Sequence, residues 1–248
     1  MQNMKINRKH LANGKIGVFD SGIGGLTILE ELKEILPNEK YLFYADSKNC
    51  PYGEKSDKDL YNITSNVVEY LIKNDCKIII IACNTATTRC IKYLRQKYSD
   101  VIFVGTEPAI KLACDNDYKN ILVMATPATI TSEKINILVN KNKKEYENIF
   151  LVPCEGLADA IETNNLLKQE TIISSIYNEY KDKDIDAIVL GCTHYPHIKD
   201  LINKYFSKAD LLDGSNGVAR ECKRQLQKRR LLGMYETLDV EIINSKDF

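Results

Sequence analysis

Two segments of the sequence run from an aliphatic stretch through a small residue to a cysteine, and polar side chains follow the cysteine in both. The segments are KIIIIACNTAT (77–87) and DAIVLGCTHYP (186–196). They present Cys83, Asn84 and Thr85, and Cys192, Thr193 and His194. A thiol titrates near ~8.5, so a modest change in its pKa makes it an acid or a base at neutral pH. A single cysteine at a strand end is more often a packing residue than a catalytic one, so the repetition of the pattern is what makes Cys83 and Cys192 candidates for chemistry.

The segment DSGIGG (20–25) carries a carboxylate and a hydroxyl group, in Asp20 and Ser21. Its glycines permit a tight turn and expose backbone N–H groups that can bind an anion. The G-x-G-G spacing is not a dinucleotide-binding fingerprint, and the stretch lacks the Lys-Ser/Thr of a P-loop. Because a carboxylate at a strand end is costly without a partner, a substrate ammonium group is a suitable partner for Asp20.

The other cysteines are expected to be packing residues, since free cysteine is among the most buried residue types. They are Cys50, Cys76, Cys90, Cys114, Cys154 and Cys222. No C-x-x-C pair occurs in the chain. In a reducing compartment this pattern favours free thiols over disulfides or a zinc knuckle.

Short apolar runs without polar alternation are typical of strands in a parallel sheet that is covered on both faces. The runs are 16–20, 41–46, 78–83, 101–106, 121–126, 149–154 and 187–193. Stretches of helical period separate them, such as Leu60, Ile63, Val67 and Leu71. The alternation predicts an α/β fold, in which ligands collect at the carboxyl ends of the strands.

The echo between the two cysteine segments predicts two similar α/β halves. We expect a first domain of residues 1–99 plus 209–248, because the helix after Asp213 returns to it, and a second domain of residues 100–208. Residues 1–15 are expected to form a flexible extension.

The composition favours neither nucleic acid nor a membrane as a partner. Lys+Arg and Asp+Glu balance at 34 each in a chain of 248 residues, so no global field attracts polyanions. No run reaches the roughly 18 apolar residues of a membrane span, and the N-terminus lacks the apolar core of a signal peptide. These features predict a cytoplasmic protein that acts on a small molecule.

Four motifs, taken in order and spacing, resemble those of the glutamate racemases in the aspartate/glutamate racemase superfamily. They are IGVFDSGIGGLTIL, YADSKNCPYG, IIIACNTAT and LGCTHYP, and the resemblance runs from about residue 16 to about residue 230. It implies two flavodoxin-like parallel-sheet domains with pseudo-twofold similarity and an active site between them. It also implies racemisation of glutamate without cofactor or metal, which supplies D-glutamate for peptidoglycan, cell wall biogenesis and cell shape.

The resemblance also implies roles for individual residues. The acid and base are Cys83 and Cys192, assisted by Asp20 and His194. The substrate contacts are Asp20, Ser21, Tyr52, Gly53, Asn84, Thr85, Thr193 and His194. A supporting glutamate is expected in VPCEGLADAIE (152–162), where Glu162 and Glu155 are rival candidates.

Several alternatives stay open at the level of sequence. The substrate could be aspartate or another amino acid, and the scaffold could serve a non-catalytic binding or regulatory protein. A Cys-His hydrolase built on Cys192 and His194 is disfavoured, because we expect the two side chains to point in opposite directions beyond the strand. A metal site of Cys192, His194 and His197 does not have a known zinc spacing. A homodimer is neither required nor excluded.

Overall fold

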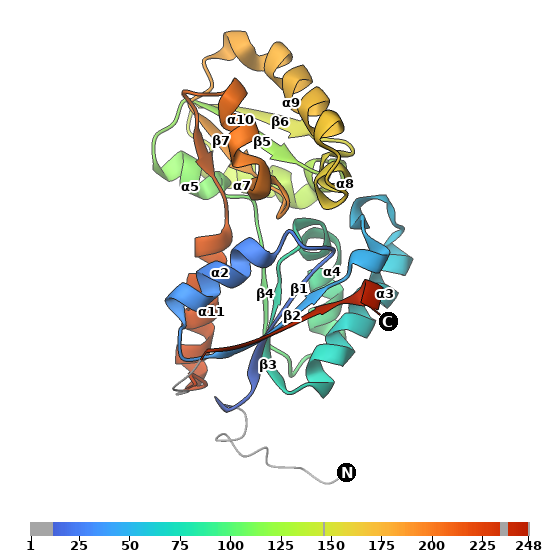
Figure 1. Cartoon of the computed structure of the whole chain (residues 1–248). Coiled ribbons are helices and arrows are strands. Elements are labelled where there is room, and N and C mark those ends of the chain that lie inside the picture. The colour runs from blue at the N-terminus through green and yellow to red at the C-terminus, as the bar shows by residue number, and fades with distance from the viewer. Residues whose placement is uncertain (1–11, 146, 234–237, 248) are drawn as a thin grey trace.

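The computed structural model describes residues 12–145, 147–233 and 238–247. In this part of the chain the strands form two separate parallel sheets, one above the other in Figure 1. The first sheet has the order β4-β3-β1-β2-β9. Its strands are β1 (Lys15–Asp20), β2 (Lys40–Ala45), β3 (Cys76–Ile81), β4 (Phe103–Gly105) and β9 (Asp239–Asn244). The second sheet, of order β6-β5-β7-β8, comprises β5 (Asn120–Ala125), β6 (Asn148–Pro153), β7 (Ala187–Leu190) and β8 (Asp210–Leu212).

Helices cover both faces of the first sheet. On one face lie α2 (Leu26–Ile35) and α11 (Ser215–Arg229), and on the other lie α3 (Asp57–Lys73) and α4 (Asn84–Lys97). Ile78, Ile79, Ile80 and Ile81 of β3 are therefore all fully buried. This burial on both sides explains why the strand reads as an uninterrupted aliphatic run.

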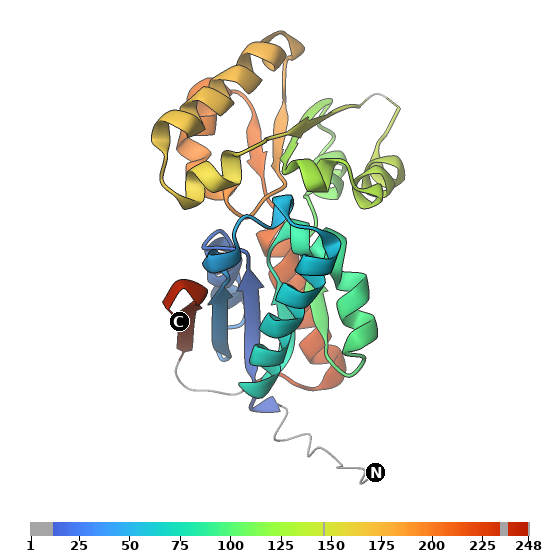
Figure 2. The same cartoon turned by 90° about the vertical axis from the view of Figure 1, so that its right-hand side faces the viewer.

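The second sheet is covered in the same way. One face carries α8 (Leu157–Glu162), α9 (Leu166–Tyr180) and α10 (Lys199–Tyr205), and the other carries α5 (Ile110–Asp115) and α7 (Glu133–Asn142). We call β1–β4, β9, α2–α4 and α11 the first lobe. The second lobe is β5–β8 with α5–α10, including the short helix α6 (Pro127–Ile130). Figure 2 shows the chain crossing between them twice, once after β4 and once after β8.

The α/β fold with two parallel sheets, predicted from the sequence, is confirmed. All seven predicted strands form, and α11 packs in the first lobe as expected. Sheet membership differs slightly from the expected domain limits, because β4 joins the first sheet beyond residue 99 and β8 joins the second beyond residue 208. Of the expected extension, residues 1–11 lie outside the described residues, and Lys15 begins β1.

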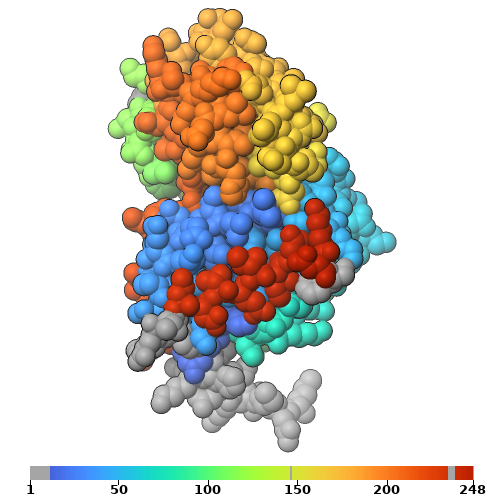
Figure 3. All heavy atoms as spheres, viewed as in Figure 1, coloured from blue at the N-terminus to red at the C-terminus, as the bar shows by residue number. Residues whose placement is uncertain are grey.

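Two strands were not predicted. β8 has only three residues, and β9 pairs in parallel with β2 at the edge of the first sheet. Figure 3 shows β9 and the following residues lying across the surface of the first lobe, and it shows the two lobes in contact on that face. None of the described helices is long and apolar enough to cross a membrane.

A buried ion pair lies at the end of the first sheet where β2 and β3 begin. Lys77 Nζ lies 2.5 Å from Glu39 Oε2, and the two side chains are 0% and 1% exposed. Lys77 also donates to Ala12 O, and Glu39 accepts from Gly233 N at 2.7 Å. The pair thus ties the start of β1 and the segment after α11 to the sheet.

Removing the Glu39 carboxylate should destabilise the protein strongly. Glu39→Ala leaves the Lys77 ammonium buried without a counter-charge, which costs about 3–5 kcal/mol of unfolding free energy. Glu30→Ala, which breaks the more exposed pair of Glu30 with Lys33, should cost about 1 kcal/mol or less. Urea unfolding of both variants measures the difference, and equal losses in the two variants would contradict it.

Candidate active site

A small cavity lies at the junction of the two lobes, where the carboxyl ends of the two sheets meet. Cys83 comes from the first lobe and Cys192 from the second, and both line this cavity. The other predicted residues that line it are Ser21, Tyr52, Gly53, Asn84, Thr85, Thr193 and His194. The cavity volume is about 20 Å³, which leaves space for about one water molecule. The structure is therefore a closed form of the site.

Cys83 stands at the start of α4. Its Sγ accepts a hydrogen bond from Ala86 N at 3.4 Å, as the N-cap of the helix. Burial raises the pKa of the Cys83 thiol, and the charge of Asp20 raises it further. The Ala86 N–H and the Ser21 hydroxyl act in the opposite direction. In the closed site the neutral thiol of Cys83 is consequently the favoured form.

Cys192 begins a chain of proton-carrying groups. Its Sγ lies 3.8 Å from His194 Nδ1, and His194 Nε2 lies 2.7 Å from Glu162 Oε2. Burial opposes the charged imidazolium, but the hydrogen bonds to Cys192 and Glu162 outweigh it and raise the pKa of His194 well above its usual value. These contacts thus favour the charged form of the buried His194 ring, with the Glu162 carboxylate as its counter-charge.

Glu162 joins the two lobes. Its carboxylate belongs to α8 of the second lobe and accepts hydrogen bonds from Ile23 N at 3.0 Å and Ser47 Oγ at 2.8 Å, both in the first lobe. Burial alone raises the pKa of Glu162, but the bonds from His194, Ile23 and Ser47 lower it to about 2. Glu155, the rival candidate, is exposed on the surface. The structure therefore places Glu162, and not Glu155, beside His194.

Asp20, a predicted substrate contact, is fully buried and is not among the residues that line the closed cavity. Thr193 Oγ1 donates to its carboxylate from the other lobe, 3.2 Å from both oxygens, and Gly25 N donates to Oδ2 at 3.0 Å. Burial raises the pKa of Asp20, although the His194 charge and these hydrogen bonds oppose the rise. The loop N–H groups of Gly25 and Ile23 thus bind anions, and these anions are carboxylates of the protein itself.

Hydroxyl and amide groups complete the wall of the cavity. Thr85 Oγ1 lies 3.1 Å from Thr126 Oγ1 across the lobe boundary, and Thr126 lies 3.1 Å from Thr129 Oγ1. The side-chain oxygen of Asn84 is buried and has no hydrogen-bond partner among the described residues. A buried acceptor without a donor is costly, so Asn84 is suited to receive an N–H group of a ligand.

Tyr52 and Gly53 belong to η2 (Tyr52–Glu54). The Tyr52 hydroxyl donates to Asp46 Oδ2 at 2.6 Å, and burial, followed by the Asp46 charge, raises its pKa well above the usual value. The hydroxyl is therefore engaged within the protein, and what Tyr52 offers the cavity is its ring and backbone. Gly53 faces open space.

Two glycines of the DSGIGG loop permit the close approach of the lobes. A Cβ atom on Gly22 would overlap the Glu162 carboxylate, and one on Gly24 would lie 2.7 Å from Thr193 Oγ1 and 2.8 Å from His194 N. The glycines are required by packing against the second lobe, as well as by the turn itself.

The structure corrects two expectations. Cys192 and His194 do not point apart, because the chain leaves β7 at Leu190 and turns, so that the thiol and the ring come within hydrogen-bond distance.

Cys50 is not a buried packing residue but is partly exposed and lines the cavity. The ring of His197 lies with Nε2 3.3 Å from Gly24 O, and Cys192, His194 and His197, the rival metal trio, do not form a cluster of ligand atoms among the described residues. Ser47 was missed, since a serine in DSKN has no signal of its own.

A family model of Asp/Glu/Hydantoin racemases matches residues 16–222. The chain belongs to this family. The resemblance drawn from the motifs is confirmed, and with it the prediction that the protein is a racemase, an isomerase.

The racemase is 42% identical to the glutamate racemase of Clostridium perfringens (strain SM101) over 240 residues, which make up 95% of this chain and 92% of that protein. A solved glutamate racemase of Francisella tularensis, in complex with D-glutamate, is 30% identical with a TM-score of 0.79. A glutamate racemase isoform of Bacillus anthracis is 26% identical with a TM-score of 0.81. In both cases 94% of this chain and 89% of the other chain are covered.

Removal of the Glu162 carboxylate should lower the pKa of His194. Folding raises that pKa, so the charged pair contributes stability that is fully present below the unfolded value of about 6.5 and is lost as pH rises through the folded value. In Glu162→Gln the imidazolium loses its main counter-charge, and the ring should titrate at lower pH. NMR titration of the His194 ring measures this.

Glu155→Gln is the control for this experiment, because Glu155 is exposed and should leave the titration unchanged. A His194 ring that is already neutral at pH 7 in the unmodified protein would contradict the ion pair. A His194 pKa in Glu162→Gln that equals the pKa in the unmodified protein would also contradict it.

Proposed function

We propose that the racemase interconverts L-glutamate and D-glutamate, with Cys83 and Cys192 as acid and base on opposite faces of the substrate. The observation that carries this proposal is that the two cysteines come from corresponding positions in two lobes and line one cavity. The names of the relatives support glutamate as the substrate, and D-glutamate is bound in the solved Francisella tularensis relative.

The reaction needs one thiolate and one thiol. The thiolate takes the α-proton and leaves the electron pair on the α-carbon, and the thiol on the other face then donates its proton there. The opposite enantiomer exchanges the two roles. Positioned acid and base groups each contribute roughly 10²–10⁴-fold to the rate.

The two halves of the site handle the proton differently. On the Cys192 side, the imidazolium of His194 can hold a thiolate by a charged hydrogen bond or pass it a proton, and Glu162 keeps the ring charged and oriented. On the Cys83 side, the helix N-terminus and the Ala86 N–H favour the thiolate, while burial and Asp20 favour the thiol. Substrate binding supplies the charge that decides between the two forms.

The polar groups of the cavity fit an amino acid. The Asn84 side-chain oxygen and the Asp20 carboxylate can receive the α-ammonium group, and the hydroxyls of Ser21 and Thr85 can hold a carboxylate. As negative charge grows on the α-carboxylate, these donors stabilise it more strongly. Protein groups therefore suffice for the chemistry we propose, which includes no cofactor and no metal.

Because the closed cavity holds about one water molecule, the lobes must separate to admit glutamate. The bonds that break are those between lobes, including Glu162 with Ile23 and Ser47. Following the resemblance to its relatives, we propose that the enzyme acts in the cytoplasm and supplies D-glutamate for peptidoglycan. A homodimer is compatible with this role.

Replacing each thiol should abolish racemisation and leave a one-sided activity. A serine hydroxyl is too weak an acid to give a base at neutral pH, so Cys83→Ser and Cys192→Ser should each lose at least ~10²-fold in racemisation rate. By resemblance, Cys83 takes the proton of D-glutamate and Cys192 that of L-glutamate. Each variant should still eliminate a leaving group from a β-substituted glutamate, but only from the enantiomer whose proton faces the remaining thiol.

Elimination assays with both enantiomers, alongside α-proton exchange in D₂O, measure this preference. Cys76→Ser, a change to a partly exposed cysteine at the other end of β3, is the matched control and should keep its activity. If both variants prefer the same enantiomer, or if either racemises at the unmodified rate, the two-thiol mechanism is wrong.

A further inference from the structure

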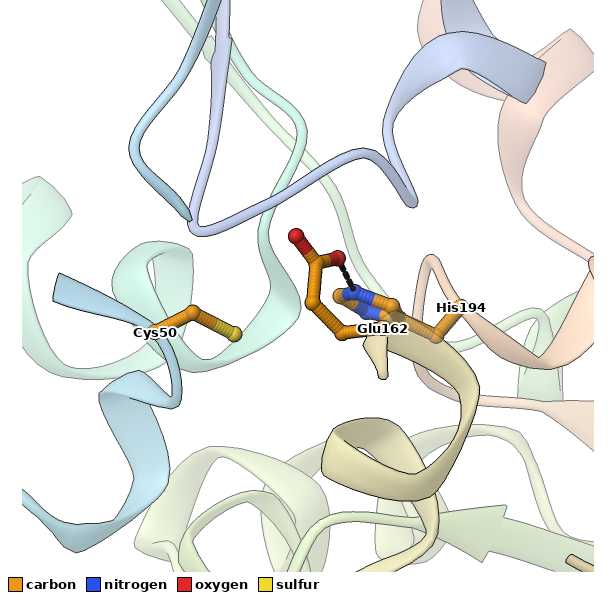
Figure 4. Close-up of side chains that lie close together, drawn as sticks. All are labelled: Cys50, Glu162 and His194. Carbon is orange, nitrogen blue, oxygen red and sulfur yellow. Dashed lines mark hydrogen bonds and ion pairs between the residues drawn. The ribbon is translucent and has the colours of Figure 1, made fainter. Parts of the chain in front are cut away.

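A third cysteine stands beside the catalytic groups without a part in the proposed reaction. Cys50 follows η1 (Ser47–Asn49) in the first lobe, and its thiol points toward Glu162 and His194 of the second lobe (Figure 4). One ligand atom from each of the three residues lies within 4.8 Å of the other two. Sulfur, carboxylate oxygen and imidazole nitrogen thus converge on one point between the lobes.

We propose that Cys50, Glu162 and His194 form an inhibitory binding site for a thiophilic divalent cation, with Zn²⁺ as the best match. This site lies beside the proposed catalytic centre and goes beyond the proposed function. It also differs from the Cys192, His194 and His197 trio, which the structure does not bring together.

The donor set fits zinc chemistry. Zn²⁺ binds cysteine sulfur at about 2.3 Å and imidazole nitrogen or carboxylate oxygen at about 2.0–2.2 Å, and three protein ligands leave a fourth position for water. Tetrahedral bonds of these lengths place the ligand atoms roughly 3.3–3.8 Å apart. The present spacing of 2.7 Å between Glu162 and His194 must open slightly, and Cys50 must approach by up to about 1 Å.

The ligands are already oriented by neighbouring groups. Ile23 N and Ser47 Oγ hold the Glu162 carboxylate, and Cys192 Sγ lies at the second ring nitrogen of His194. Metal sites depend on such outer contacts to fix ligand orientation. Cys50 is partly exposed, which gives an ion a route to the cluster.

The local charge favours a cation. Glu162 supplies a carboxylate ligand, and the negative charges of Glu162 and Asp20 both act on the Cys50 sulfur. These charges attract a dication, whose binding displaces two protons to the solvent, one from the Cys50 thiol and one from His194 Nε2, and leaves a zinc-bound thiolate and a neutral imidazole ligand.

Occupancy should stop the racemase in two ways. A metal bound at Nε2 of His194 replaces the proton that makes the ring an imidazolium, so the ring can no longer donate charge toward Cys192. The ion would also link Cys50 of the first lobe to α8 and His194 of the second, and it would hold the lobes closed against substrate entry.

The test measures binding directly and inhibition separately. Reduced, metal-free protein is titrated with Co²⁺, and a sulfur-to-cobalt charge-transfer band reports thiolate ligation. Zn²⁺ affinity is then measured by displacement of Co²⁺. The unmodified protein should bind one Zn²⁺ with the band present, and Zn²⁺ should inhibit glutamate racemisation reversibly, with full recovery in EDTA.

Cys50→Ala should weaken Zn²⁺ binding and inhibition by at least about 10-fold, relative to the zinc-free rate of each protein. Cys50→Ser keeps the side-chain shape and should behave likewise. Cys76→Ser is the matched control, because Cys76 is also a partly exposed thiol, and it should bind as the unmodified protein does.

Absence of the cobalt band in the unmodified protein would overturn the site. The site would also be overturned if Cys50→Ala kept both the cobalt charge-transfer band and the zinc affinity of the unmodified protein. Zinc binding without inhibition would retain the site and refute its inhibitory role. The cobalt titration does not depend on activity, so its result is distinguishable from a failure of the proposed racemase reaction.

Discussion

The carboxylate of Glu162 lies where donors from three separate segments converge on it. Ile23 and Ser47 reach it from the first lobe, and the His194 ring reaches it from the second. A buried imidazolium is unfavourable without such a counter-charge, and a buried carboxylate is unfavourable without such donors. Both members of the pair belong to the second lobe, and the first lobe adds the Ile23 N–H and the Ser47 hydroxyl to the carboxylate when the lobes are closed. Closure therefore completes the hydrogen bonding of the carboxylate that pairs with His194.

The two lobes share an architecture, but the groups that surround their cysteines differ. Both present a cysteine beyond a central strand of a parallel sheet, and the cysteines share a cavity. Cys83 is the N-cap of a long helix, whereas Cys192 lies in a turn that brings His194 to its sulfur. The reaction that we propose is nearly symmetric, yet each thiol is controlled by different groups. Such a difference allows one side to rest as a thiol while the other carries charge from its neighbours.

The sequence predicted those features that depend on local pattern. Aliphatic runs such as residues 78–81 marked the buried strands, and the helical period of Leu60, Ile63, Val67 and Leu71 marked α3. The sequence could not predict β9, because the apolar residues of this edge strand show no clear period. The strand is positioned by its pairing with β2. The supporting glutamate was narrowed to two candidates, and only the packing of α8 against the DSGIGG loop separates Glu162 from Glu155. Cys50 resembled a packing cysteine, since nothing in NCPYG shows that the chain folds over a second lobe there.

The central claim is that one substrate carbon lies between Cys83 and Cys192, and a crystal structure of the protein with bound glutamate tests it most directly. The account predicts that both sulfurs lie about 3–3.5 Å from the reacting centre of the substrate, on opposite faces of the α-carbon. It also predicts that the His194–Glu162 pair is closed over the ligand. Glutamate bound with both sulfurs on the same face of the α-carbon, or with either sulfur out of reach of its hydrogen, would contradict the account.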